Sequence, residues 1–299
     1  MKFSKFAKQA LAVAFAGLVA VPAVSHAALI NSLLNIGVVN EIQDTDAERI
    51  VDAQGNVVTS GNFQVGYQIQ SILRFDTANS ETIADTLPSP YKLTSYSELM
   101  IAGITGVQTI SGVDVPTMAA CTAADAKCAL VMAPTGNLGA GVMANLYEGP
   151  TFSQSVAPAT GIAGVQGNTL ITQVGIAKST DFWFAIVSNA NPVDQIGIIA
   201  SAGATAGQAG QFIFGLSVIS NPGGLWYEPQ QMTGTFGNQH DVIGNGSAYA
   251  RSPGVNTGWL LSSNTLIQFV VPEPGSLALV GALVVAAGVA STRRKQAKA

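Results

Sequence analysis

The sequence predicts a mainly β, antiparallel ectodomain, a β-sandwich or a jelly-roll-like fold, between an N-terminal signal helix and a short C-terminal transmembrane helix. Three observations predict it. The apolar residues of 62–75 alternate with polar ones, β-branched and aromatic runs are separated by Gly, Pro and Asn, and an uncharged apolar stretch lies near each end. We therefore divide the chain into a signal peptide (1–27), a secreted β-rich body (28–270) and a C-terminal segment (271–299).

The first 27 residues have the three parts of a secretory signal peptide. Three lysines among the first eight residues precede the apolar stretch 11–21, and the small residues Ser25 and Ala27 occupy the positions that signal peptidase reads. Cleavage is expected between Ala27 and Ala28. Because the basic region lacks an Arg-Arg pair, we expect export through the Sec translocon.

Alternation with a period of two marks the clearest strand of the body, in residues 62–75. The apolar positions there are Phe63, Val65, Tyr67, Ile69, Leu73 and Phe75. Residues 48–61 predict a hairpin, because β-branched residues flank a Gln-Gly-Asn turn. The apolar runs 181–189, 211–220 and 264–271 predict three further strands.

Helix is predicted in two short stretches of the body, 95–104 and 118–133. Residues 197–210 consist almost entirely of Gly, Ala and other small residues. We expect them to form a mobile loop, and closely packed strands are the alternative.

Charge is distributed unevenly along the chain. Residues 28–271 contain six basic and sixteen acidic residues, a net charge of −10, whereas residues 1–27 and 272–299 each carry +3. An acidic body repels phosphate backbones, which argues against a nucleic-acid partner. Basic residues at both ends suit the cytoplasmic side of a membrane, with the acidic body translocated between them.

The C-terminal segment combines three features in a fixed order. Pro272, Glu273 and Pro274 form an extended tripeptide, because proline cannot continue a helix or a sheet interior. The uncharged run 276–292 would span about 26 Å as a helix, just short of a hydrocarbon core of about 30 Å. The basic cluster that follows is Arg293, Arg294 and Lys295. This order predicts an apolar segment that holds the chain in the membrane temporarily, with the basic cluster kept on the cytoplasmic side.

The arrangement over residues 271–295 resembles the PEP-CTERM sorting signal of Gram-negative bacteria. The resemblance implies that an exosortase-type membrane protease recognises the Pro-Glu-Pro tripeptide and releases the protein to the cell surface or the extracellular matrix. It also implies an association with exopolysaccharide and biofilm formation. An ordinary single-pass anchor is the alternative, in which the chain stays whole.

The two cysteines, Cys121 and Cys128, predict a disulfide bond, since an exported pair is usually oxidised. On one straight helix their Cα atoms would lie about 10.5 Å apart, which is too far for a bridge. The disulfide therefore requires a loop or a hairpin, whereas a helix over 118–133 would leave both thiols free. No histidine lies nearby, so the pair predicts no metal site.

His240 is the one histidine left after signal cleavage, and it stands beside Asp241. In an extended segment these two side chains point to opposite faces, and the chain has no G-x-S-x-G motif, so no Ser-His-Asp triad is predicted. Residues 139–144 match G-x-G-x-x-A, but no acidic residue follows at the required distance. We therefore expect no dinucleotide and no other cofactor.

Acidic residues gather in 41–52, and calcium binding is the sharper interpretation, with Asp44, Asp46 and Glu48 as candidate ligands. The EF-hand spacing fails, because Arg49 occupies the position that needs Gly. We favour the alternative that these side chains form a solvated acidic edge, which discourages pairing with strands of other chains.

Trp226, Tyr227 and Trp259 adjoin loop-forming residues and are candidate platforms for stacking sugar rings. We favour the alternative that they fill the ends of the sandwich. These features together predict an exported, non-catalytic protein that is a structural or adhesive component of the extracellular matrix. A carbohydrate-binding module that retains matrix polysaccharide is the alternative. A secreted hydrolase ranks third, because the sequence singles out no pair of carboxyl groups.

Overall fold

The structure is a computed structural model that describes residues 30, 33–35, 38–83, 88–189, 193–201, 210–224, 231–251 and 258–271. The strands are β1 Val39–Val51, β2 Gln68–Ala78, β3 Glu81–Thr82, β4 Lys92–Ile110, β5 Val113–Ala120, β6 Lys127–Pro134, β7 Val142–Gly149, β8 Thr169–Gly175, β9 Phe182–Ser188, β10 Gly210–Ser220, β11 Met232–Thr233, β12 Gln239–His240, β13 Val242–Ala250 and β14 Leu261–Val270. The helices are α3 Pro158–Gln166 and α4 Gln195–Ser201. The prediction of a mainly β, antiparallel fold is confirmed.

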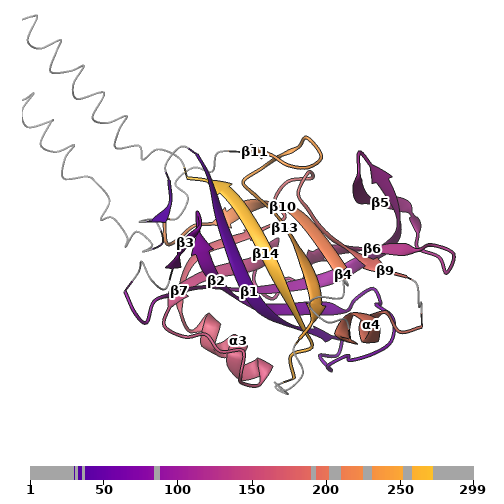
Figure 1. Ribbon diagram of the computed structural model, residues 1–299, viewed down its shortest axis with the longest axis horizontal. Helices are drawn as coiled ribbons and strands as arrows, with labels where there is room; N and C mark the ends of the chain where they lie inside the picture. The colour runs from indigo at the N-terminus through magenta and orange to yellow at the C-terminus, as the bar shows by residue number, and fades with distance from the viewer. Residues whose placement is uncertain are drawn as a thin grey trace, which may run out of the picture.

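Twelve of the described strands form one antiparallel sheet that closes on itself. The strand order runs from β3 through β2, β1, β14, β13, β10, β8 and β7 to β4, and β4 also pairs with β2. In Figure 1, β1, β14 and β13 cross in front of β2, β4 and β7, so two walls face each other as in a sandwich. Hydrogen bonds join these walls at both sides, and the inward side chains share one interior.

The 19-residue strand β4 organises the closed sheet. One of its edges pairs with β2, while the other pairs first with β7, over Lys92–Ser97, and then with β6, over Leu99–Thr105. Strand β10 mirrors this arrangement, because it pairs with β9 over Gly210–Gly215 and with β8 beyond Ser217. The wall between β4 and β10 therefore consists of two pairs of strands placed end to end.

The helix prediction for 95–104 is wrong, because these residues lie in β4. Ser95 and Ser97 face the interior, whereas Tyr96 lies on the outer face and packs beneath Ile162 and Val165 of α3. Both faces of this part of β4 are thus buried, and the polar alternation that identifies a half-exposed strand is missing.

Three further predictions of local structure need correction. Residues 118–133 are divided between β5, a loop and β6, so this helix prediction is also wrong. Residues 197–201 belong to α4 rather than to a loop, while 202–209 lie outside the described residues. The strand predicted over 62–75 begins only at Gln68, because a turn with Gly66 at a positive φ precedes it.

Smaller elements close and extend the sheet. Phe63, Ile196 and Ile199 are buried against the main core, so the turn before β2 and the helix α4 fill one end of the interior. The second half of β4 and β5 extend away from the sheet as a hairpin arm (Figure 1). The predicted signal helix and the predicted transmembrane helix 276–292 lie outside the described residues. Within the described ranges, no helix has both the length and the apolar character needed to cross a membrane.

Candidate functional site

The closed sheet surrounds an internal cavity. The volume of this cavity is about 90 Å³, whereas a single buried water needs only about 10–15 Å³. Most of the side chains that line it are apolar and come from all sides of the sheet. The cavity is smaller than a typical ligand pocket of about 300–1,000 Å³, so it can hold only a small organic molecule of a few non-hydrogen atoms.

One wall of the cavity is aromatic. The ring of Trp183 on β9 lies 4.6 Å from the ring of Phe214 and 6.3 Å from the ring of Phe212, both on β10, measured between centroids. Gly246 and Gly244 of β13 lie directly opposite these two phenylalanines in the register. A Cβ atom on either glycine would overlap the neighbouring phenyl ring, so the glycines allow the rings to lie flat against the strand.

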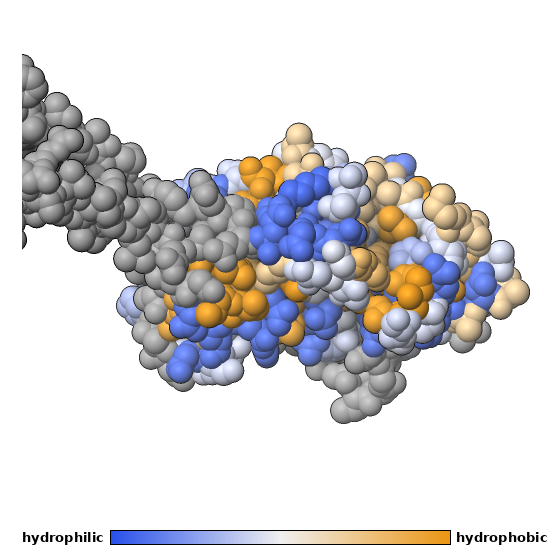
Figure 2. Space-filling model, turned by 90° about the horizontal axis from the view of Figure 1, so that it is seen from above, coloured by the Kyte–Doolittle hydropathy of each residue, from blue (hydrophilic) through white to orange (hydrophobic). Residues whose placement is uncertain are grey.

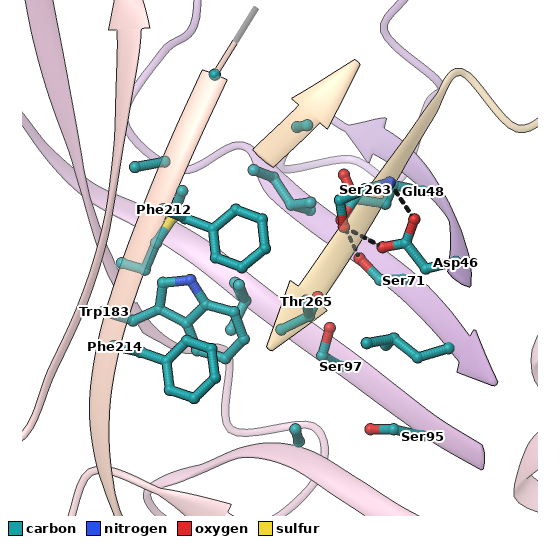
Figure 3. A pocket seen from close by; sticks show the side chains of 18 of the residues that line it. Asp46, Glu48, Ser71, Ser95, Ser97, Trp183, Phe212, Phe214, Ser263 and Thr265 are labelled. Carbon is teal, nitrogen blue, oxygen red and sulfur yellow. Dashed lines mark hydrogen bonds between the residues drawn. The ribbon is translucent and has the colours of Figure 1, made fainter. Parts of the chain in front are cut away.

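The opposite wall carries a cluster of carboxyl and hydroxyl groups (Figure 3). The hydroxyl of Ser263 donates to the carboxyl groups of Asp46 and Glu48, and the hydroxyl of Ser71 also donates to Glu48, at 3.1 Å. Asp46 and Glu48 are two positions apart on β1, which places both on the inner face of the sheet. Ser95 and Ser97 of β4 extend this polar wall.

The carboxyl groups also replace part of the sheet's own hydrogen bonding. Strands β1 and β14 pair as far as Gln43 opposite Leu266, and again at Glu48 opposite Leu261. Between these points, Asp44 accepts a hydrogen bond from the backbone N–H of Thr265, and Asp46 accepts one from the backbone N–H of Ser263. The two aspartates thus occupy a seam in the sheet.

The prediction of a solvated acidic edge is therefore wrong for Asp44, Asp46 and Glu48, which are all buried. The reason is the position of β1 between β2 and β14, which makes it an interior strand of the sheet. The described residues contain no group of three or more metal-ligating side chains arranged around a common point, so the calcium interpretation gains no support.

Burial controls the protonation of this cluster. It raises the pKa of Asp46 well above its usual range, and the nearby charge of Glu48 raises it further. Burial likewise raises the pKa of Asp44. Burial therefore favours the protonated, neutral form of Asp46 and of Asp44.

The predicted disulfide between Cys121 and Cys128 is confirmed, with a Cα–Cα distance of 5.6 Å. Cys121 lies just after β5 and Cys128 is in β6, so the bond closes a loop at the base of the arm. The side chain of Asn189 donates to the carbonyl groups of Thr122 and Asp125 in the same loop.

His240 has a partner that the sequence did not suggest. Its Nδ1 lies 3.2 Å from Oδ1 of Asp181, which is 59 positions away, and both side chains are buried. Asp241 instead pairs with Lys178 and accepts a hydrogen bond from the backbone of Val218. Nε2 of His240 has no hydrogen-bond partner among the described residues, so no nucleophilic hydroxyl is bonded to it. The pair holds the β12 segment against β9.

Trp259 is only 5% exposed, packs beneath α3 and donates its indole N–H to the carbonyl of Val156. The prediction that it stacks on sugar rings is therefore wrong, and the alternative of a packing role is correct for this residue. The other predicted site residues lie outside the described residues: Ala27, Ala28, Trp226, Tyr227, Pro272, Glu273, Pro274, Arg293, Arg294 and Lys295.

The sequence alone does not bring the aromatic wall and the buried polar cluster together as one site. A signal was present, because Gly244 and Gly246 alternate at the spacing of Phe212 and Phe214. Recognising it would have required the pairing of β10 with β13. Comparisons of the chain with protein-family models, with curated proteins and with solved structures found no match, so the geometry of the cavity is the basis for any functional proposal.

Proposed function

We propose that this is an exported, non-catalytic binding protein that holds a small, mainly apolar molecule with a polar end inside its closed sheet. The observation that carries the proposal is the two-sided cavity, with Trp183, Phe212 and Phe214 on one wall and a carboxyl and hydroxyl cluster on the other. Such a lining can bury an apolar body and orient one polar group.

Figure 2 shows polar side chains over the middle of one face, with apolar side chains gathered only in smaller separate areas. The terminal segments of the sequence provide the proposed place of action. A signal peptide, Sec export and processing by an exosortase-type protease would deliver the protein to the cell surface or the matrix, as a structural or adhesive component that carries its ligand.

Filling the cavity tests this proposal. Ala185 of β9 lines the cavity, so Ala185→Leu should occupy its space and abolish ligand binding. Ala120→Leu, at an exposed position at the end of β5, is the matched control and should bind as the wild type does. We expect native mass spectrometry of the exported protein to detect a bound small molecule, or thermal unfolding to detect added alcohols or amines. Equal binding by both variants would contradict the proposal.

A second candidate function is polysaccharide binding on the outer face of β10, β13 and β14. A groove of about 360 Å³ on this face is lined by the polar side chains of Gln211, Asn245, Ser247 and Gln268 together with Ile213 and Ile243. Amide groups beside apolar side chains suit sugar hydroxyls and ring faces. Binding on a glycan array that is lost in Asn245→Ala but kept in Ala185→Leu would favour this function over the interior site.

A further inference from the structure

The cavity holds a net excess of carboxyl groups without a basic side chain to balance them. Its lining includes Asp46 and Glu48, whereas no lysine, arginine or histidine lines it. Arg251 interacts electrostatically with Asp46 but donates to the carbonyl of Gln154, and Arg49 donates to Gln70. Among the described residues, no salt bridge involves Asp46 or Glu48. A positive charge is the missing component of this site.

Two serine hydroxyls provide an independent sign of a ligand. Ser95 and Ser97 are 3% and 4% exposed, and both line the cavity on the side of the carboxyl cluster (Figure 3). Within the described part of the chain, neither hydroxyl forms a hydrogen bond with another residue. Buried polar groups normally have partners, so these two hydroxyls are placed to bind a polar group inside the cavity.

The aromatic wall favours a cation over a neutral polar group. Trp183 and Phe214 form a tilted pair, and Phe212 lies beside them, so three rings border the cavity opposite the carboxyl cluster. Indole and phenyl faces attract organic cations, and the attraction is stronger in a desolvated site. An ammonium group that reaches the carboxyl oxygens would leave its apolar body against these rings.

We infer that the cavity binds a small organic ammonium ion, whose charge pairs with Asp46 and Glu48 and whose apolar body contacts the wall of Trp183, Phe212 and Phe214. This inference rests on the proposed binding function and names the ligand class. On binding, the proton held by Asp46 leaves to solvent, so one cation enters as one proton is released. The raised pKa of Asp46 agrees with a proton held there in the free protein.

Other ionisable groups act on the same proton. Asp44 and Glu48 interact with Asp46 from β1, and Asp76 of β2 acts on it through Asp44. Tyr249 of β13 and Arg251, just after β13, also interact electrostatically with Asp46. The three further carboxyl groups favour proton binding and Arg251 opposes it. Affinity for a cation should therefore increase as the pH rises and Asp46 loses its proton.

The test compares two probes of the same size, n-butylammonium and 1-butanol, by titration calorimetry on the exported protein. We expect butylammonium to bind at least about tenfold more tightly than butanol at pH 8, with an affinity that falls by up to about tenfold per pH unit below the pKa of Asp46. Measurements in two buffers with different ionisation enthalpies should show the release of one proton per ligand.

Variants separate the charge from the cavity itself. Asp46→Asn and Glu48→Gln should each remove the preference for butylammonium while butanol still binds, and circular dichroism should show an intact fold. Asp114→Asn, on the arm and far from the cavity lining, is the control and should keep the preference. Equal binding of both probes to the wild type would overturn the ammonium inference but leave the binding function intact. Binding of neither probe, with Ala185→Leu also indistinguishable from the wild type, would overturn both.

Discussion

Asp46 stabilises the fold through its hydrogen bonds and also makes stability depend on pH. Its carboxyl group accepts from the backbone N–H and the hydroxyl of Ser263, so it supports the seam between β1 and β14. Desolvation of the charged form opposes this contribution. The same residue therefore holds the sheet together most firmly when it is protonated.

We expect the contribution of Asp46 to the free energy of unfolding to fall as the pH rises above about 4. Burial raises the pKa of Asp46 in the folded state above its unfolded value of about 3.9, so the folded protein binds the proton more tightly. Stability from this group is fully present below the unfolded pKa and is lost as the pH rises through the folded pKa, at about 1.4 kcal/mol for each unit of difference. Urea unfolding at several pH values measures this slope.

The variant Asp46→Asn cannot ionise and should show a smaller loss of stability with rising pH. Asp114→Asn serves as the control, because a hydrogen bond from Lys127 lowers the pKa of Asp114 and gives that residue the opposite pH dependence. A slope in Asp46→Asn as steep as in the wild type would show that another group causes it.

Gly246 leaves the space in which the ring of Phe212 lies against β13. We expect Gly246→Ala to destabilise the protein by about 1–3 kcal/mol, because its methyl group would overlap the ring of Phe212 and the carbonyl of Asn264. Gly210→Ala is the matched control in the same sheet, since the nearest atom to its new Cβ lies 3.6 Å away. Unfolding midpoints that shift equally in both variants would contradict the proposed role of the glycine.

At the scale of single elements, the hairpin arm depends on the disulfide. Replacing both Cys121 and Cys128 with Ala should lower the free energy of unfolding by roughly 2–2.5 kcal/mol, the value for a loop of this size in the chain-entropy model. Met118→Ala, at a fully exposed position on the arm, should change stability by less than about 0.5 kcal/mol.

The thiols themselves provide a direct measurement. Alkylation of the exported protein without a reductant should label neither cysteine, whereas reduction first should expose both to the reagent. Stoichiometric labelling of the unreduced protein would show that the bond is absent in the exported form.

Strand β4 shows why some elements were predictable and others were not. The sequence identifies β10 correctly, because Phe212, Phe214 and Leu216 alternate along it at the spacing of a strand. In β4 the covering helix α3 buries the outer face, so Tyr96 and Glu98 are as buried as Ser95 and Ser97. A local pattern cannot show which strand a distant helix will cover. For this reason the sequence of residues 95–104 predicts a helix although these residues lie in β4.

The cavity could be predicted only in fragments for the same reason. The sequence identifies Asp44, Asp46 and Glu48 as possible calcium ligands. Their burial follows from the pairing of β1 with β14, whose residues are more than 200 positions apart in the chain. The Asp181 partner of His240 depends in the same way on the contact between distant segments. Period and composition determine the fold class, whereas the strand order determines the site.

At the scale of the whole molecule, the sorting interpretation of the C-terminal segment stays a prediction. Replacing Pro272, Glu273 and Pro274 with Ala should leave export intact but keep full-length protein in the inner membrane, because the tripeptide is the expected recognition site of the membrane protease. The intact mass of the surface form in the native host measures cleavage. A surface form that still contains residues 276–299 would identify a plain transmembrane anchor.

The pairing of β1 with β14 has a mechanical consequence. Val39 and Val270 face each other at one end of the sheet, so the chain enters and leaves the body at the same pole. Tension applied between these two points would break the hydrogen bonds between β1 and β14 one after another. Tension from Val270 to a partner at the opposite pole would instead run along β14, across hydrogen bonds perpendicular to the strand that must break together. A protein that is anchored by its C-terminal end and bound by a partner at the opposite pole would therefore resist a large force. The same force applied between its two chain ends would unfold it.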